Sequence, residues 1–406
     1  MFSRPLSVAL PVQEQSNVPV QNRSSQADIP ALNALALRSL LLLFQAKKKL
    51  FSRRLTMTAK GLCQDESSPR DTIVVLLGLQ RVRESGAVIP FDIAAISDAV
   101  LRDSSWVKSI GDLGLLTWFT AECFPARLGI LFREFNFEKA LGAYLDGRQA
   151  HTIGLSWFLN GIARAQLAWD GTVPDLTDIA VDTYHLLQEN QGESGIFGHA
   201  RFAKGLSWTF WNRFGTFADQ IYAIYALTSF ARAFQVEEPL ASALDCANSL
   251  RTLQGEMGQW WFLYDKRACR VVNRYPVLSL HQNGIGPLGL LALGEATSQN
   301  FHDPVYRGVS WVAGTNELGD DLRNFDQGLI WNSIGLRRRI SNYWEGALSF
   351  RNGPSRAKEK SFRIRCEVWA DHFGWLLCAF GRFGLPKGAA KATVGGTGEE
   401  AKGSIS

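Results

Sequence analysis

The sequence predicts an all-α fold, an (α/α)6–7 toroid, in which inner and outer helices alternate around a closed ring and short β-hairpins occupy the loops on one face. Three observations support this prediction. Helices that are apolar on every side alternate with amphipathic ones, the apolar helices recur about every 40 to 45 residues, and one longer unit occurs twice. Helices that are apolar all round must be covered on all sides, which favours a closed ring over an open solenoid.

Length and composition fit one large globular domain. The chain has 406 residues, of which 46% are hydrophobic and 20% charged, as in soluble globular proteins. We expect the toroid to span residues 29–385, and the polar segments 1–28 and 386–406 to be disordered tails. The net charge of +5 is small and the basic residues are scattered, so we expect no nucleic-acid partner.

Cysteine usage indicates a reducing compartment, and the apolar segments of the chain indicate neither a secretory signal nor a membrane span. The six cysteines are far apart and form no Cys-x-x-Cys pair, so we expect free thiols, a cytoplasmic location, no metal site and no cofactor. The start of the chain has no apolar signal core, and the run 40–44 is too short to span a membrane.

Each predicted inner helix begins with a polar or ionisable residue directly after a loop. Amphipathic outer helices are predicted between them, for example over 177–188, 240–253 and 304–313. The residues that begin the inner helices are Asp71, Asp112, His151, Asp219, His281, Asp326 and Asp371. The number of hairpins, six or seven, stays open at this point.

The repeated unit is a Gln-x-x-x-Gly segment followed by an aromatic loop and a further helix. The second copy starts at Gln254 and leads to Gln282, 28 residues later; the first starts at Gln191 and leads to Gln220, 29 residues later. Such a shared offset indicates one supersecondary unit used twice. In the second copy, alternation over 260–265 and 271–276 around a charged turn predicts a β-hairpin.

The Gln-x-x-x-Gly-x-Trp motif at Gln254, Gly258 and Trp260, with a weaker copy at Gln191, resembles the repeat of squalene-cyclase and protein-prenyltransferase β-subunit toroids. The architecture is also similar to the α/α barrels of six-hairpin glycosidases, N-acylglucosamine epimerases, glucuronyl C5-epimerases and polysaccharide lyases. The resemblance implies a toroid and leaves the chemistry open. The Asp-x-Asp-Asp acid of class II terpene cyclases is missing from the sequence, and 319–321 is the nearest approach to it.

In a toroid the inner helices start on one face, so their first residues are expected to converge at one mouth. Asp219, Asp326 and Asp371 are candidate acids and bases because each has a polar neighbour. His281, near the predicted hairpin, is a candidate base with Tyr264 as its acid. The alternative is that the aspartates cap helix ends. The expected substrate-binding residues are Trp208, Trp211, Gln220, Trp260, Trp261, Asp265, Tyr275, Gln282, Gln327 and His372.

These features predict a carbohydrate-active enzyme, a hydrolase, lyase or epimerase acting on an oligosaccharide or a uronic-acid-containing glycan by acid/base catalysis. The loop tryptophans would stack on sugar faces. Two alternatives remain: a terpene-cyclase-like or prenyl-processing toroid with an Asp acid in an aromatic cavity, and a non-catalytic scaffold that binds a glycan or a protein. The oligomeric state is left open.

Overall fold

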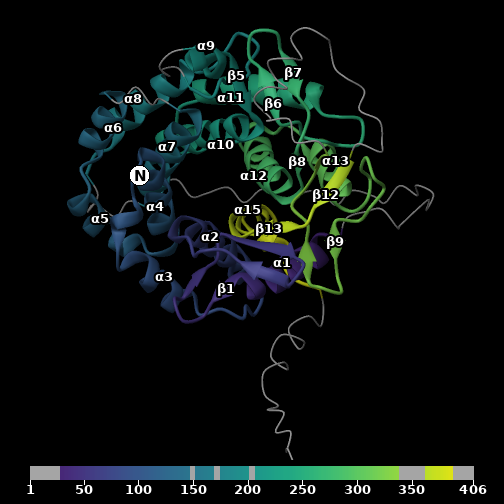
Figure 1. Ribbon diagram of the computed structural model, residues 1–406. Helices are drawn as coiled ribbons and strands as arrows, with labels where there is room; N and C mark the ends of the chain where they lie inside the picture. Colours follow the sequence, from purple (N-terminus) through teal and green to yellow (C-terminus); the bar gives the residue numbers. More distant parts are fainter. Residues whose placement is uncertain (1–27, 147–150, 169–173, 201–205, 338–361, 387–406) are drawn as a thin grey trace, which may run out of the picture.

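The structure is a computed structural model that describes residues 28–146, 151–168, 174–200, 206–337 and 362–386, without the side chains of 206–209. The predicted tails therefore lie outside the described residues, apart from Asp28 and Pro386 at their inner ends. Within the described ranges, six helices form the inner ring (Figure 1): α2 (Pro69–Glu84), α4 (Ile110–Cys123), α7 (Thr152–Leu167), α10 (Phe217–Phe234), α12 (Ser279–Thr297) and α15 (Ala370–Phe380).

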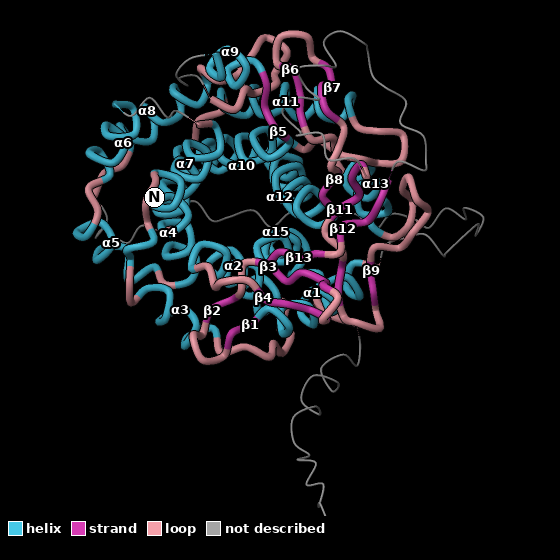
Figure 2. The backbone as a smooth tube through the Cα atoms, in the orientation of Figure 1, coloured by secondary structure: helices cyan, strands magenta, loops and turns pink. Residues whose placement is uncertain are grey.

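The ring is closed, as the sequence predicts. Each inner helix packs against the next, and α15 packs against both α12 and α2, so the first and last inner helices are neighbours. Figure 2 shows this ring of helices seen along its axis, with the other helices outside it. An open solenoid is therefore excluded.

Outer helices cover the ring. They are α1 (Ile29–Leu43), α3 (Ile93–Leu101), α5 (Leu128–Glu134), α6 (Phe137–Asp146), α8 (Thr177–Gln188), α11 (Glu238–Leu253) and α13 (His302–Val312). Helix α1 packs on α15, so the two ends of the toroid together form the last hairpin. Helix α8 has the predicted bounds, and α11 and α13 begin two residues earlier than predicted.

Glycine allows the inner helices to approach closely. A Cβ on Gly114 of α4 would lie 2.4 Å from backbone atoms of Phe158 on α7, and a Cβ on Gly161 would lie 2.3 Å from the carbonyl oxygen of Gly114. Gly78 of α2 and Gly374 of α15 make the same kind of contact, with a Cβ on Gly78 at 2.5 Å from the Gly374 carbonyl oxygen. These helix pairs pack backbone to backbone.

Small antiparallel sheets precede the inner helices. In one sheet β4 (Gly61–Gln64) leads into α2 and β13 (Glu367–Trp369) leads into α15, with β3 (Arg54–Thr58) between them. In a second sheet β8 (Val277–Leu278) leads into α12 and pairs with β11 (Ser333–Leu336), which pairs with β12 (Phe362–Arg365). In a third sheet β5 (Phe214–Thr216) leads into α10 and pairs with β6 (Leu263–Asp265), which pairs with β7 (Arg270–Asn273). The β6–β7 pair is the predicted hairpin. Strands β1 (Phe44–Gln45) and β2 (Leu50–Phe51) pair separately.

The repeated unit is structurally the same in both copies. The side-chain amide of Gln191 donates to the carbonyl oxygens of Gly195 and of Ser242 on α11; that of Gln254 donates to Gly258 and to Pro304 on α13. Gly195 and Gly258 have φ of +80° and +90°, where a side chain would be strained. Each glutamine thus ties its own loop to the next outer helix.

The prediction of an inner helix that starts at Asp326 is wrong. The segment forms strands β9 (Arg323–Asn324) and β10 (Leu329–Ile330) followed by β11. Asp326 is exposed in the β9–β10 turn, where the amide of Gln327 donates to the Asn324 side chain. The described ring therefore has six inner helices instead of seven.

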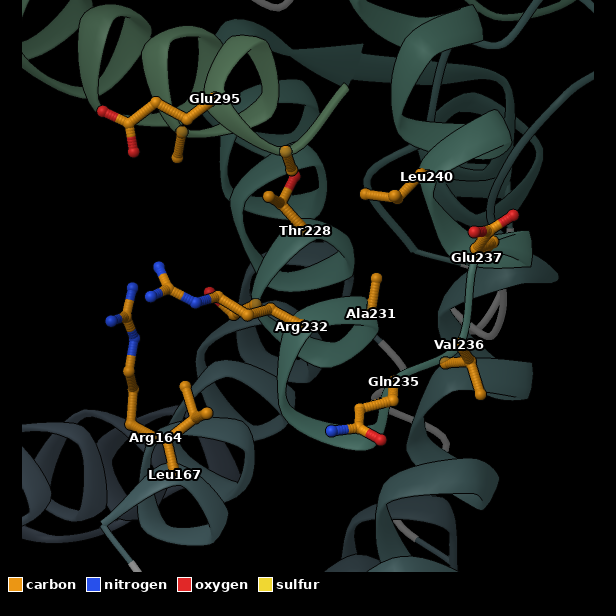
Figure 3. A pocket seen from close by; sticks show the side chains of 13 residues that line it. Arg164, Leu167, Thr228, Ala231, Arg232, Gln235, Val236, Glu237, Leu240 and Glu295 are labelled. Atoms are coloured by element: carbon orange, nitrogen blue, oxygen red, sulfur yellow. The ribbon is translucent and has the colours of Figure 1, made fainter. Parts of the chain in front are cut away.

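The two rims of the ring differ. A cavity of about 900 Å³ gathers residues from the C-terminal halves of five inner helices, among them Arg81, Arg164, Arg232, Glu295 and Cys378. Figure 3 shows the adjoining pocket of about 600 Å³, where Arg164 and Arg232 point toward one another near Glu295. Since these C-terminal ends share one rim, the N-terminal ends share the other. None of the described helices is both long and apolar enough to cross a membrane.

Candidate active site

Aromatic rings from four inner helices fill the middle of the toroid. Trp375 of α15 lies 5.4 Å from Tyr222 of α10, 5.7 Å from Trp118 of α4 and 6.2 Å from Trp157 of α7 (centroid distances). Trp118 and Trp375 are each 1% exposed, whereas Trp157 is partly exposed. Together with Tyr222, these three tryptophans form an aromatic floor below the N-terminal mouth.

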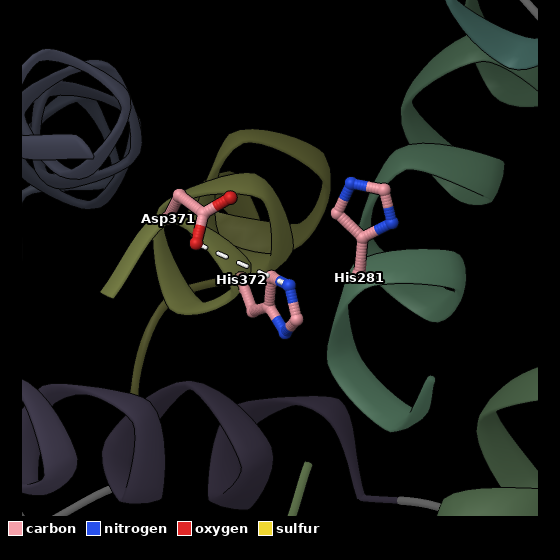
Figure 4. Close-up of side chains that lie close together, drawn as sticks. All are labelled: His281, Asp371 and His372. Carbon is pink, nitrogen blue, oxygen red and sulfur yellow. Dashed lines mark ion pairs between the residues drawn. The ribbon is translucent and has the colours of Figure 1, made fainter. Parts of the chain in front are cut away.

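One group of ionisable side chains lies beside this floor, where α12 and α15 begin. His281, Asp371 and His372 offer ligand atoms that all lie within 4.8 Å of one another, and Figure 4 shows the two imidazoles facing each other beside the carboxylate. The imidazole centroids are 4.9 Å apart. Burial, and then the proximity of His372, lowers the pKa of His281 well below its usual value, and burial lowers the pKa of His372 to about 3. Both rings are therefore neutral near pH 7.

A second carboxyl group, Asp71 on α2, interacts with Asp371. Burial, and then the nearby Asp371 carboxylate, raises the pKa of Asp71. Burial likewise raises the pKa of Asp371, against the opposing effects of two backbone hydrogen bonds and the charges of Arg53 and Arg70. A carboxyl group whose pKa is raised in this way can stay protonated closer to neutrality and act as a general acid.

The aspartates at the inner-helix starts fall into two kinds. Asp112 and Asp219 are the N3 residues of capping boxes closed by Ser109 and Thr216, so the expectation that such residues serve helix ends is confirmed for these two. Asp71 Oδ2 and Asp371 Oδ1 are buried and have no hydrogen-bond partner among the described residues. Asp112 Oδ1 is also buried without a hydrogen bond in the described ranges, but Arg70 lies 2.5 Å from it, so of these four aspartates only Asp71 and Asp371 keep an oxygen free for a ligand.

A second cluster lies where α7 and α10 begin. His199 Nδ1 is 3.0 Å from Oδ1 of the fully buried Asp219, and the His199 ring is 5.0 Å from that of His151. Asp219 outweighs burial and raises the pKa of His199, whereas burial, and then His199, lowers the pKa of His151. The carboxylate orients His199 in the way an Asp–His pair orients a catalytic imidazole.

An open groove of about 930 Å³ reaches Asp71. It is lined by Asp71 together with Arg53, Arg70, Glu66 and Trp106, and by residues of the β1–β2 and β3–β4 segments. Arg70 binds Asp112 at 2.5 Å, and the Arg53 guanidinium lies 5.3 Å from the Trp369 ring centroid. Trp369 in turn stacks on His372. The groove places polar and cationic groups at the entrance to Asp71.

Gln220 and Gln282, expected to bind substrate, bind backbone. Gln220 accepts from the Phe197 amide and donates to the Phe197 and Thr216 carbonyl oxygens; Gln282 accepts from the Leu278 amide and donates to the Trp261 carbonyl oxygen. Both side chains are at most 1% exposed. They join the aromatic loop of each repeat to the following helix.

The residues expected on the β6–β7 hairpin are mostly enclosed. Tyr264 is fully buried, its hydroxyl accepts from the Trp261 amide, and burial raises its pKa above the usual value. Asp265 is fully buried against Arg213 at 2.6 Å. Tyr275 donates to Glu317. The expected pairing of Tyr264 as an acid with His281 has no support in these contacts, because the hydroxyl is committed to the loop.

The loop tryptophans that were expected to bind substrate differ in their surroundings. Trp260 is 1% exposed and stacks on Phe217, and Trp261 packs at an edge against Tyr275. Trp211 lies 4.9 Å from His199, beside the second cluster. The side chain of Trp208 lies outside the described residues. Asp326 and Gln327 sit on the exposed β9–β10 turn, away from the inner-helix starts.

The mouth thus combines expected and overlooked residues. His281, Asp371 and His372 lie together, and Asp219 reaches the same face through His199. Asp71 was recognised only as a helix start, although its place in the series of starts was the signal that could have identified it. His151 was recognised in the same way, and no sequence signal marked Arg53.

Comparison with protein-family profiles and with curated proteins finds no match. Solved structures do match. One described as a possible member of the GH105 family, from Klebsiella pneumoniae subsp. pneumoniae, is 11% identical, with 91% of this chain and 95% of that chain covered at a TM-score of 0.57. An unsaturated glucuronyl hydrolase specific for heparin is 13% identical (86% and 94% covered, TM-score 0.54), and a sugar epimerase from a ruminal bacterium 7% (86% and 96%, TM-score 0.55).

At these identities the likeness establishes the fold. The chain has the α/α-toroid fold of these structures, as the resemblance in its sequence implies. It aligns over most of its length with nearly the whole of each structure.

Proposed function

We propose that this protein is a carbohydrate-active enzyme that transfers protons to and from a sugar at the N-terminal mouth of the toroid. The observation that carries the proposal is that two clusters of imidazole and carboxyl groups, His281–Asp371–His372 with Asp71 and His199–Asp219 with His151, lie beside the ring-filled centre of one barrel. Aromatic rings stack on sugar faces, and the flanking groups supply acids and bases.

Proton abstraction at a sugar carbon, as in epimerases and lyases, is the reaction class that best fits these groups. A general base works best with a pKa near the working pH, a condition that His199, oriented and charged by Asp219, meets better than His281 and His372, which burial makes neutral but weak bases. Its partner acid must keep its proton, and Asp71, whose pKa is raised, meets that need. The solved structures with a similar fold include a sugar epimerase and glucuronyl hydrolases, which also supports a sugar substrate.

A second candidate reaction is glycoside hydrolysis by the two interacting carboxyl groups, Asp71 and Asp371. Glycosidases use such a pair, and the separation of the two groups decides between inversion and retention. A prenyl substrate is disfavoured because the mouth holds several ionisable groups instead of a single acid in an apolar cavity. A non-catalytic scaffold is disfavoured because Asp71 and Asp371 keep an oxygen that no helix end uses.

The test is a panel of uronic-acid oligosaccharides and reducing sugars incubated with the purified chain in D2O. Deuterium uptake at a sugar carbon, or an unsaturated product, would support proton abstraction, and new reducing ends without either would support hydrolysis. Asp371→Asn should lower the rate by about 100-fold or more, the scale of general acid–base catalysis. Asp326→Asn, the same change on an exposed turn, should leave it unaltered. A folded protein that alters no member of the panel would contradict the proposal.

A further inference from the structure

Three side chains, those of His281, Asp371 and His372, face one another with atoms of the kinds that bind transition metals. They comprise two imidazoles and one carboxylate, which is the ligand set of the 2-His-1-carboxylate sites that hold divalent metals with open positions for substrate. Two helices supply them, His281 from the first turn of α12 and the adjacent pair from the first turn of α15. The two helices pack side by side in the ring.

The spacing is too wide for direct hydrogen bonds and suits an ion between the groups. His372 Nε2 and Asp371 Oδ1 are 4.0 Å apart, as the dashed line in Figure 4 marks, beyond hydrogen-bond range. The three ligand atoms all lie within 4.8 Å of one another. Bonds of about 2.0–2.2 Å to a shared ion would place them roughly 3.4–4.2 Å apart, so side-chain rotation need supply only about 1 Å of contraction.

A second observation also indicates a ligand. Asp371 Oδ1 is buried and has no hydrogen-bond partner among the described residues, and the same is true of Asp71 Oδ2 on the neighbouring helix α2. Buried carboxylate oxygens without partners are costly, and an ion removes that cost. The nearby cations have other contacts, since Arg70 binds Asp112 and Arg53 lies over Trp369.

We propose that His281, Asp371 and His372 form a binding site for a divalent transition-metal ion such as Zn²⁺ or Co²⁺. No ligand spacing in the sequence indicated such a site. Imidazole and carboxylate ligands with open positions suit an ion that polarises a sugar carbonyl or hydroxyl. The binding claim does not depend on the proposed function and is tested without any sugar.

The experiment titrates the chelator-treated full chain with Co²⁺ by calorimetry and visible absorption, and then displaces Co²⁺ with Zn²⁺. We expect one cobalt per chain, with the visible spectrum of nitrogen and oxygen ligands. Binding at the free cysteines would instead give thiolate charge-transfer bands. His281→Ala and Asp371→Asn should each weaken binding by at least about tenfold, since even outer-shell partners of a metal site contribute that much.

Matched controls make the same changes elsewhere. His302→Ala, which changes an exposed side chain at the start of α13, and Asp326→Asn, on the exposed β9–β10 turn, should bind cobalt as the parent chain does. Circular dichroism verifies that each variant is folded, and His372→Gln provides a second ligand change if His281→Ala unfolds. No binding by the parent chain, or equal binding by the ligand variants, would overturn the site. An inactive chain that binds cobalt would count against the proposed function alone.

Discussion

Asp219 links helix capping to the second ionisable cluster, so replacing it tests both roles. Its Oδ2 accepts hydrogen bonds from the Thr216 amide and hydroxyl, each at 2.7 Å, and its Oδ1 accepts from His199 at 3.0 Å. Asp219→Asn keeps the shape and loses one acceptor and the charge. A lost cap costs about 1 kcal/mol and a lost bond to a charged group about 1.5–3 kcal/mol, so we expect the free energy of unfolding to fall by roughly 3 kcal/mol.

That loss converts into a modest shift of the melting temperature. With an unfolding entropy of about 2.1 cal/mol/K per residue, a chain of 406 residues should melt roughly 4 °C lower. The shift should also depend on pH. The folded protein raises the pKa of His199, so its contribution to stability is fully present below the unfolded value near 6.5 and is lost as pH rises through the folded-state pKa.

Calorimetric melts of the parent chain and of Asp219→Asn between pH 5 and 9 measure both effects. Asp112→Asn is the matched control, because Asp112 closes the same kind of capping box but pairs with Arg70 instead of a histidine. It should lose comparable stability with no change in the loss around pH 6.5. A pH-independent loss in Asp219→Asn, or no loss at all, would refute the assigned coupling to His199.

Three further predictions concern packing, the repeated unit and the mouth. Gly114→Ala should lower the free energy of unfolding by several kcal/mol, measured by denaturant titration, because its Cβ would lie 2.4 Å from backbone atoms of Phe158. Gly142→Ala, in open space on α6, should raise the free energy of unfolding by about 0.5–1 kcal/mol. Gln254→Ala should cost about 1–3 kcal/mol for its two bonds across the loop, against less than about 0.5 kcal/mol for the exposed Gln327→Ala. Because the pKa of Asp71 is raised, its contribution to stability falls as pH rises above its ordinary value near 4, so Asp71→Asn should flatten that decline in melts at rising pH.

Most of the ring could be predicted from the sequence because its signals are local. Apolar runs that start at a polar residue marked α4, α10 and α12, and amphipathic spacing marked α8. The prediction of a helix after Asp326 was wrong because a short apolar run can form either a helix or a strand. Here Gly328, at φ +69°, supports a tight turn, and strands on either side take up the apolar residues.

The free carboxyl group in the mouth could not be predicted, because its environment depends on a tertiary hydrogen bond. The capping-box pattern of Ser or Thr followed three residues later by Asp occurs at Ser109–Asp112, Thr216–Asp219 and Ser68–Asp71. The Ser109 and Thr216 amides donate to the aspartate and close the box.

The Ser68 amide instead donates to the carbonyl oxygen of Phe51 on β2, 3.1 Å away. Asp71 Oδ2 therefore lacks the donor that its counterparts have, and it remains buried without a partner. The hydrogen bond from Ser68 to β2 thus determines that Asp71 does not cap its helix and keeps a carboxyl oxygen available for chemistry. Moving β2 away from Ser68 should therefore free the Ser68 amide to close the third box, turn Asp71 away from Asp371 and stabilise α2.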